Sequence, residues 1–109
     1  MMSAQMKTFF DMTGQMWAKG ELVGKAAGVF TSVGTQGGGL ETTALTTVTQ
    51  LAHHGIIFVP TGYSFGSWMS DLSEVHGATP YGAATLAGPD GKRQPSQGEL
   101  AYAEYQVGP

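Results

Sequence analysis

Apolar side chains at helical spacing predict that the chain opens in an amphipathic helix. Met2, Met6, Phe9, Phe10, Met16 and Trp17 recur at the spacing of one helix face, with polar residues on the other side. Ser3 is the expected N-cap. Gly14 is expected to weaken or end the helix, because glycine is a poor helix former.

The next hydrophobic stretches predict a strand, a helix and a second strand. Lys25 to Val33 and Ile56 to Val59 are continuous enough in apolar residues to be buried parallel strands. Between them, Glu41 to Ala52 predicts a helix that ends at a left-handed Gly55. The expected buried stripe of this helix consists of Ala44, Leu45, Val48, Leu51 and Ala52. A helical crossover obliges the two strands to be parallel.

Two parallel strands cannot form a stable sheet alone, because both edges would be open. We therefore expect the chain to be the C-terminal part of a larger doubly wound sheet. Residues 61–94 contain many turn-forming residues and predict a long ordered loop, with a short strand at Tyr81 to Leu86. Ser96 and Glu99 have the spacing of a capping box, which predicts a final helix that stops at Gly108 and Pro109.

Composition narrows the class of protein. A chain of 109 residues holds one domain at most, and its 12% of charged residues and net charge of -3 leave no basic stripe for nucleic acid. There is no cysteine, and the three histidines lack clustered carboxylates, so we expect no metal site. The longest apolar run is far too short to span a membrane. We expect a cytoplasmic protein without integral membrane association. Peripheral association with a membrane stays an open alternative.

A glycine-rich segment follows the first predicted strand and opens the predicted helix. Gly34, Gly37, Gly38 and Gly39 remove the side chains that would keep a flat or anionic group from the backbone. The free amides there lie near the positive end of a helix dipole. The spacing matches neither G-x-G-x-x-G nor a phosphate loop, which favours a specialised cofactor over a nucleoside triphosphate. A plain turn remains the alternative.

Long strings of the sequence resemble the WrbA-type NAD(P)H:quinone oxidoreductases, a flavodoxin-like FMN family. The matching strings are 2–11, Thr13-Gly14, Trp17, Phe30, Ser32, Gly34-Thr35, 37–39, Glu41-Thr42, 51–55, 80–82, 87–88 and 93–96. The resemblance implies an α/β doubly wound parallel sheet, with residues 1–109 as a partial domain that lacks the first three strands. It also implies the cofactors FMN and NAD(P)H, a quinone substrate, and a homo-oligomer that is tetrameric in the family.

The resemblance assigns roles to particular residues. The segment that lies along the edge of the flavin ring corresponds to Ser32, Val33, Gly34, Thr35, Gln36, Gly37 and Gly38. His53 matches a histidine that contacts the flavin and is the candidate catalytic residue. Trp17 matches a tryptophan that reaches the active site of a neighbouring subunit, where substrate binds. The residues alone favour a helix C-cap role for His53, whereas for Trp17 packing and substrate stacking are equal alternatives.

Departures from the family pattern fall within the glycine-rich segment, at Val33, Gln36 and Leu40. The segments that grip the FMN phosphate in the family have no counterpart in these residues, so we expect the isolated chain to be inactive. Two other functions stay open. One is a non-catalytic structural or interaction fragment. The other is a flavin-binding electron carrier, although the aromatic loop after Gly62 fits a substrate pocket better than a carrier.

Overall fold

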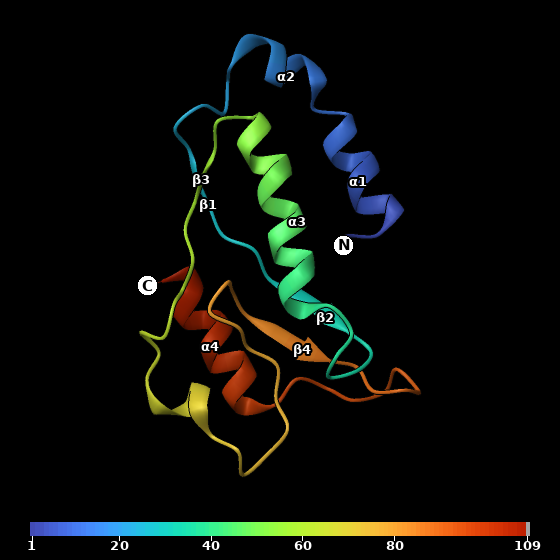
Figure 1. The fold of residues 1–109 in the computed structure, drawn as a ribbon, viewed down its shortest axis with the longest axis vertical. Helices are drawn as coiled ribbons and strands as arrows, with labels where there is room; N and C mark the ends of the chain where they lie inside the picture. The colour runs from blue at the N-terminus through green and yellow to red at the C-terminus, as the bar shows by residue number, and fades with distance from the viewer. Residues whose placement is uncertain (109) are drawn as a thin grey trace.

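The computed structural model describes residues 1–108 and has the strand–helix–strand arrangement that the sequence predicts. Figure 1 shows α3 running through the upper part of the molecule beside the first two helices, with α4 and the long loops below. The helices α1 (Ala4–Asp11) and α2 (Gly14–Lys19) replace the single opening helix. Ser3 caps α1 by accepting a hydrogen bond from the Met6 amide, as predicted.

Four short strands form two parallel pairs. β1 (Ala26–Ala27) pairs with β3 (Ile57–Phe58), so that Ala26 lies beside Ile57. β2 (Thr31–Val33) pairs with β4 (Ala84–Leu86), so that Thr31 lies beside Ala84. The predicted parallel pairing around a helix is confirmed, as is the short strand near residue 84. The prediction of one continuous strand from Lys25 to Val33 is wrong, because the ladder is interrupted between Ala27 and Thr31.

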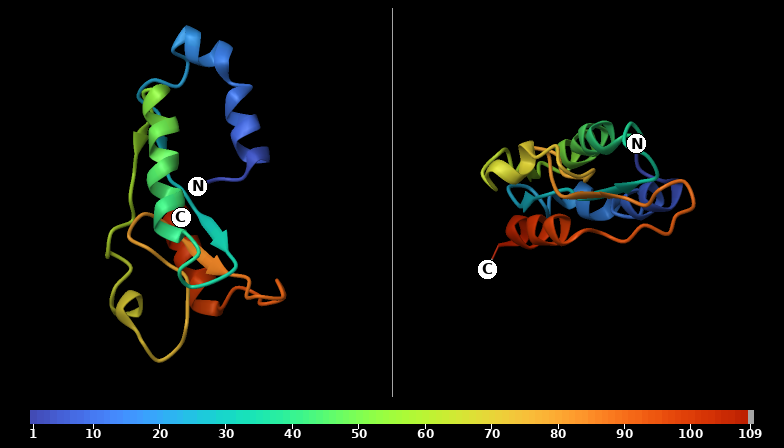
Figure 2. Two further views of the ribbon diagram at one scale, coloured as in Figure 1. Left: turned by 45° about the vertical axis from the view of Figure 1, so that its right-hand side comes forward. Right: turned by 90° about the horizontal axis from the view of Figure 1, so that it is seen from below.

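The two long helices cover opposite faces of the strands. α3 (Leu40–His53) packs on β2 and β3, and α4 (Gln97–Val107) packs on β4. Viewed from below, Figure 2 shows the strands lying between these two helices. A 3-10 turn, η1 (Ser67–Ser70), lies in the loop that leads to β4. A parallel α/β protein with helices on both faces is therefore the observed architecture.

The core is small and lies mainly around β4 and α4. Its buried apolar residues are Ala44, Leu51, Ala83, Ala84, Leu86 and Tyr102. On α3 the buried face is Ala44, Thr47 and Leu51, whereas Leu45 and Ala52 are exposed, so the predicted stripe is partly wrong. The face of α3 that touches the strands is narrower than the apolar pattern, because β2 and β3 are each only a few residues long.

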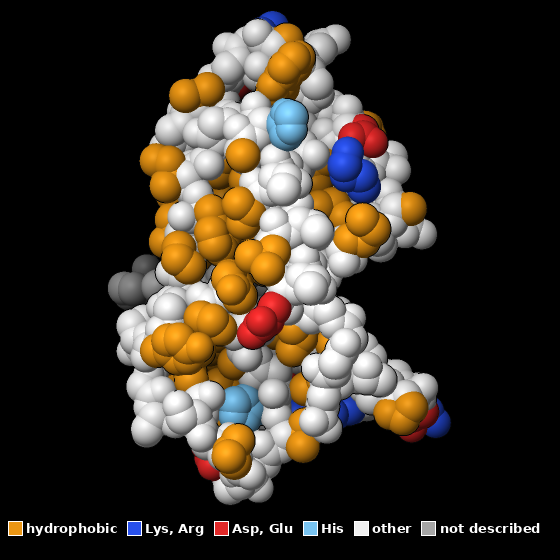
Figure 3. All heavy atoms as spheres, in the orientation of Figure 1, with side chains coloured by type: hydrophobic (Ala, Val, Ile, Leu, Met, Phe, Trp, Pro, Cys, Tyr) orange, Lys and Arg blue, Asp and Glu red, His pale blue; other side chains and the backbone are white. Residues whose placement is uncertain are grey.

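Unlike β4, the strands β1, β2 and β3 contain no buried residue, contrary to the sequence prediction. Phe30 is 81% exposed, and Ile57 and Val59 are about half exposed. Figure 3 shows apolar side chains gathered on the surface over α3 and β3. Each strand has one partner only, so within residues 1–108 no further strand covers its other edge.

Polar contacts of α4 stabilise the lower half of the molecule. The predicted capping box of Ser96 and Glu99 is confirmed. At the interruption of the ladder, Gln106 replaces missing strand contacts: its side-chain nitrogen donates to the Val29 carbonyl at 3.0 Å, and its oxygen accepts from the Ala83 amide at 2.6 Å. The helix ends at Gly108, and the predicted stop at Pro109 lies outside the described residues.

Candidate functional site

The glycine-rich loop (residues 34–39) leaves the carboxyl end of β2 and leads into α3. It closes in a turn in which the Gly38 amide donates to the Thr35 carbonyl at 3.0 Å. A Cβ on Gly38 would lie 2.9 Å from that carbonyl oxygen, so a side chain at this position would distort the turn. Gly39 is the N-cap of α3 at a φ of 108°, a conformation that favours glycine. The loop geometry therefore depends on two glycines.

Gly37 has a different environment from Gly38. A Cβ on Gly37 would meet no atom within 4 Å. Within residues 1–108, the amides of Thr35, Gln36 and Gly37 donate no hydrogen bond to the protein. These amides are therefore available to a ligand at the start of α3, where the helix dipole is positive.

Two adjoining clefts beside this loop carry negative charge. One, of about 420 Å³, is lined by the loop and by Glu41. The other, of about 440 Å³, is lined by Asp71 and Glu74. Hydrogen bonds from Ser73 hold the pKa of the Asp71 carboxyl below its usual value, so this group is ionised. No described residue that lines either cleft is Lys or Arg, which makes the clefts unsuited to a phosphate group.

Sequence reasoning missed Ala78, which lines both of these clefts. Its φ of 112° is the only positive value among the non-glycine residues of the described chain. Such a strained backbone is found disproportionately at functional sites. The sequence held no signal for this residue, because alanine predicts no special conformation.

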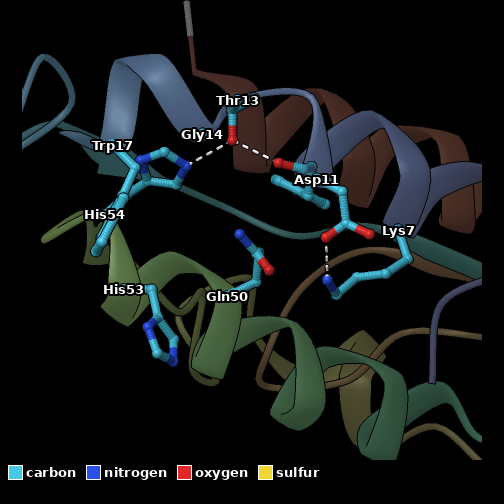
Figure 4. Close-up of a pocket in the computed structure, with 9 residues that line it drawn as sticks. Lys7, Asp11, Thr13, Gly14, Trp17, Gln50, His53 and His54 are labelled. Atoms are coloured by element: carbon cyan, nitrogen blue, oxygen red, sulfur yellow. Dashed lines mark hydrogen bonds and ion pairs between the residues drawn. The ribbon is translucent and has the colours of Figure 1, made fainter. Parts of the chain in front are cut away.

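Trp17 and His53 line a separate cleft of about 320 Å³ between α2 and the end of α3. Figure 4 shows Gln50 between them and the Lys7–Asp11 ion pair, which lies on the other side of the cleft. Trp17 is more than half exposed, so it is not the core residue that was the alternative interpretation. His53 is the last residue of α3 and is exposed. The structure therefore brings the candidate catalytic and substrate-binding residues together.

The structure does not bring these two residues to the glycine-rich loop. The loop precedes Leu40 at one end of α3, and His53 forms the other end of this helix of 14 residues. A helix of that length separates its ends by about 20 Å. The residues from Ser32 to Gly38 form one group and Trp17 with His53 form another. Within one chain, the two groups cannot contact the same flavin ring.

The described residues contain neither a metal-ligating cluster nor a membrane-spanning helix. None of the groups of His, Asp and Glu in residues 1–108 has the arrangement of a metal site. Among the helices in the same range, none combines the length and the apolar character needed to cross a bilayer.

A parallel α/β fold with a glycine-rich loop at a strand's carboxyl end defines a class of ligand-binding proteins. Within this class, the NADPH-dependent FMN reductase family matches residues 1–69. The chain belongs to this family.

Two relatives extend the match over nearly the whole chain. The quinone-oxidoreductase QR2 of Triphysaria versicolor is 58% identical over 106 residues, which are 97% of this chain and 52% of that protein. The probable NAD(P)H dehydrogenase (quinone) FQR1-like 2 of Arabidopsis thaliana is 56% identical over 105 residues, which are 96% of this chain and 38% of that protein. The chain thus spans about half, or less, of the length of these relatives.

Proposed function

We propose that the chain is the C-terminal part of a WrbA-type, FMN-dependent NAD(P)H:quinone oxidoreductase with a flavodoxin-like doubly wound sheet. The names of the two relatives support this activity. Among the structural observations, the Thr35 to Gly37 amides, which donate no hydrogen bond within residues 1–108, carry the proposal. They lie at the carboxyl end of a parallel strand, where open α/β sheets bind their ligands.

In this function the glycine-rich loop and the end of β2 lie along the edge of the flavin ring. Bound FMN would accept a hydride from the nicotinamide and pass two electrons to the quinone. The loop amides are placed to donate hydrogen bonds where negative charge gathers on reduction. Gly37 leaves room for the ring edge, since its open side meets no protein atom within 4 Å.

The FMN phosphate has to be held outside this chain. Glu41, Asp71 and Glu74 line the clefts beside the loop and would repel a phosphate. The relatives are about twice as long as this chain, or longer. We therefore assign the phosphate site to their remaining part, and we expect this chain to hold only the ring.

We assign His53 and Trp17 to binding and protonation of the quinone substrate. The imidazole of His53 is exposed and can give a proton to the quinol oxygen, a role suited to histidine near neutral pH. The exposed indole of Trp17 can stack on a flat quinone. His53 lies about 20 Å from the loop at the other end of α3, and Trp17 lines the same cleft as His53, so a complete site takes both from a second copy. A homo-oligomer, tetrameric as in the resembling family, meets this requirement.

A second function, as a non-catalytic interaction fragment, is favoured by one observation. Phe30 is 81% exposed at the interruption between β1 and β2, and the strands there have one partner each. An exposed apolar side chain beside an open strand edge is a surface on which another chain can pack. In this case the chain would dock without supporting turnover.

The test of the enzyme function is assembly from two halves. The chain is co-expressed with the N-terminal half of the Triphysaria relative, which supplies the part that this chain does not cover. The purified pair is expected to retain FMN after desalting and to oxidise NAD(P)H with benzoquinone. Assembly without flavin retention and turnover would support the interaction fragment instead.

Two variants of the loop then locate the ring. Gly37→Val is expected to reduce flavin retention without changing the melting temperature of the chain, because a Cβ at this position meets no protein atom within 4 Å. Gly37→Ala, which adds a single carbon, is expected to have a smaller effect. Equal flavin retention in the wild-type pair and the Gly37→Val pair would place the ring elsewhere.

A further inference from the structure

Thr13 and His54 form a hydrogen bond that joins the first two helices to the end of α3. The distance from Thr13 Oγ1 to His54 Nε2 is 2.8 Å, and the two residues are 41 positions apart in the sequence. Thr13 lies in the turn between α1 and α2, and His54 directly follows α3. Figure 4 shows this bond at the edge of the cleft that Trp17 and His53 line.

The direction of this hydrogen bond follows from the available protons. Thr13 donates its single hydroxyl proton to the Phe10 carbonyl at 2.6 Å. Its oxygen can therefore only accept from the histidine, so the proton of His54 is on Nε2. His54 Nδ1 is buried and has no partner among the described residues. The geometry of the pair therefore makes His54 Nε2–H the donor to Thr13 Oγ1.

One further hydrogen bond, from the Met1 amine to Thr43 Oγ1 at 3.1 Å, joins the start of the chain to the opposite end of α3. Neither helix has a buried residue, so core packing does not fix their distance from α3. Trp17 is part of α2, four residues after Thr13, whereas His53 is next to His54. The bond between Thr13 and His54 thus joins the two elements that carry the walls of the cleft.

We propose that the Thr13–His54 pair is a positioning device that holds Trp17 opposite His53 for quinone binding. His54 borders the cleft but is only 4% exposed, so we assign it a positioning role through Thr13. The two adjacent histidines therefore have different roles. His53 faces the cleft, and His54, through its hydrogen bond to Thr13, fixes the distance between the two walls of the cleft. The proposal rests on the proposed function, in which Trp17 and His53 bind the quinone.

The variants for the test remove or keep one hydroxyl group. Thr13→Val removes the hydroxyl and keeps the branched shape, while Thr13→Ser keeps the hydroxyl. Thr8→Val is the matched control, because the Thr8 hydroxyl donates to the Ala4 carbonyl at 2.8 Å on an exposed part of α1 and does not reach α3. His54→Phe removes the bond from the other side.

The first measurement uses the 109-residue chain alone. In the wild type, nitrogen NMR of His54 is expected to show a proton on Nε2. Thr13→Val and His54→Phe are expected to shift the indole N–H resonance of Trp17, while Thr13→Ser and Thr8→Val leave it near the wild-type position. An unchanged Trp17 resonance in both Thr13→Val and His54→Phe would overturn the proposal.

The second measurement uses the assembled halves. Thr13→Val is expected to raise the KM for benzoquinone by about threefold to tenfold with flavin retention unchanged, since this is the effect of one ordinary hydrogen bond. Combining Thr13→Val with His54→Phe is expected to add little to either change alone, because both remove the same bond. A KM for Thr13→Val equal to that of Thr8→Val would overturn the proposal. If the wild-type halves have no turnover, the proposed function fails, and the Trp17 resonance alone decides the positioning role.

Discussion

Glu99 provides the sharpest test of what stabilises the lower half of the molecule. Its carboxylate is 3% exposed and accepts hydrogen bonds from the Ser96 amide at 2.7 Å and the Gly77 amide at 2.8 Å. It also pairs with the Arg93 guanidinium at 2.9 Å. Through these contacts one carboxylate joins the start of α4 to the loop before β4. Neutralising it in Glu99→Gln should therefore loosen both segments.

The magnitude follows from the pKa of Glu99. Burial would raise this pKa, but the Ser96 amide, the Arg93 guanidinium and the Gly77 amide together lower it from 4.5 to about 2. Since one pKa unit corresponds to about 1.4 kcal/mol, the ionised form is favoured in the folded state by about 3 kcal/mol. The folded pKa lies below the unfolded one, so this stabilisation is complete above pH 4.5. It is lost as the pH falls from 4.5 towards about 2.

The assay is urea unfolding followed by tryptophan fluorescence, at neutral pH and at pH values from 5 down to 2. Glu99→Gln is expected to lower the free energy of unfolding at neutral pH by about 3 kcal/mol and to remove much of the acid-induced loss. Glu104→Gln, at an exposed position of the same helix, is expected to change stability by no more than about 0.5 kcal/mol. If Glu99→Gln and wild type lost stability equally in acid, the reasoning about Glu99 would be refuted.

Three further predictions concern the cofactor and the core. The isolated chain is expected to bind FMN weakly and to lack quinone turnover. The reason is that it lacks the charge-assisted contacts to the phosphate, which contribute about 1.5 to 3 kcal/mol each. Tight stoichiometric binding in a fluorescence titration would contradict this prediction. Tyr102→Phe removes a fully buried hydroxyl that donates to the Thr79 carbonyl at 2.7 Å, and urea unfolding should show a loss of about 1 kcal/mol. Gln106→Leu removes the oxygen that accepts the hydrogen bond of the Ala83 amide at 2.6 Å. Hydrogen exchange of the Ala83 amide should therefore be faster by about tenfold. An unchanged exchange rate would show that Gln106 does not protect this amide.

Local chemistry was sufficient to predict several of the elements and some of their boundaries, although not the interruption between β1 and β2. Ser96 and Glu99 predicted the start of α4, since a capping box satisfies helix amides with neighbouring side chains. Gly55 predicted the end of α3, and its φ of 70° is one that glycine adopts without strain. The parallel pairing of β1 with β3 followed from the helical crossover between them. The glycine-rich loop was predicted as the candidate ligand site because its residues are contiguous in the sequence.

What depends on distant residues could be seen only in the folded structure. The exposure of Phe30 and of Leu45 and Ala52 in the α3 stripe depends on which elements cover them, and apolar periodicity does not contain that information. The pairing of Thr13 with His54 and the strained backbone of Ala78 arise from contacts and turns that no local pattern specifies. Sequence resemblance placed His53 and the glycine-rich loop in one site. The length of α3 separates them, because a rigid helix of 14 residues holds its two ends apart.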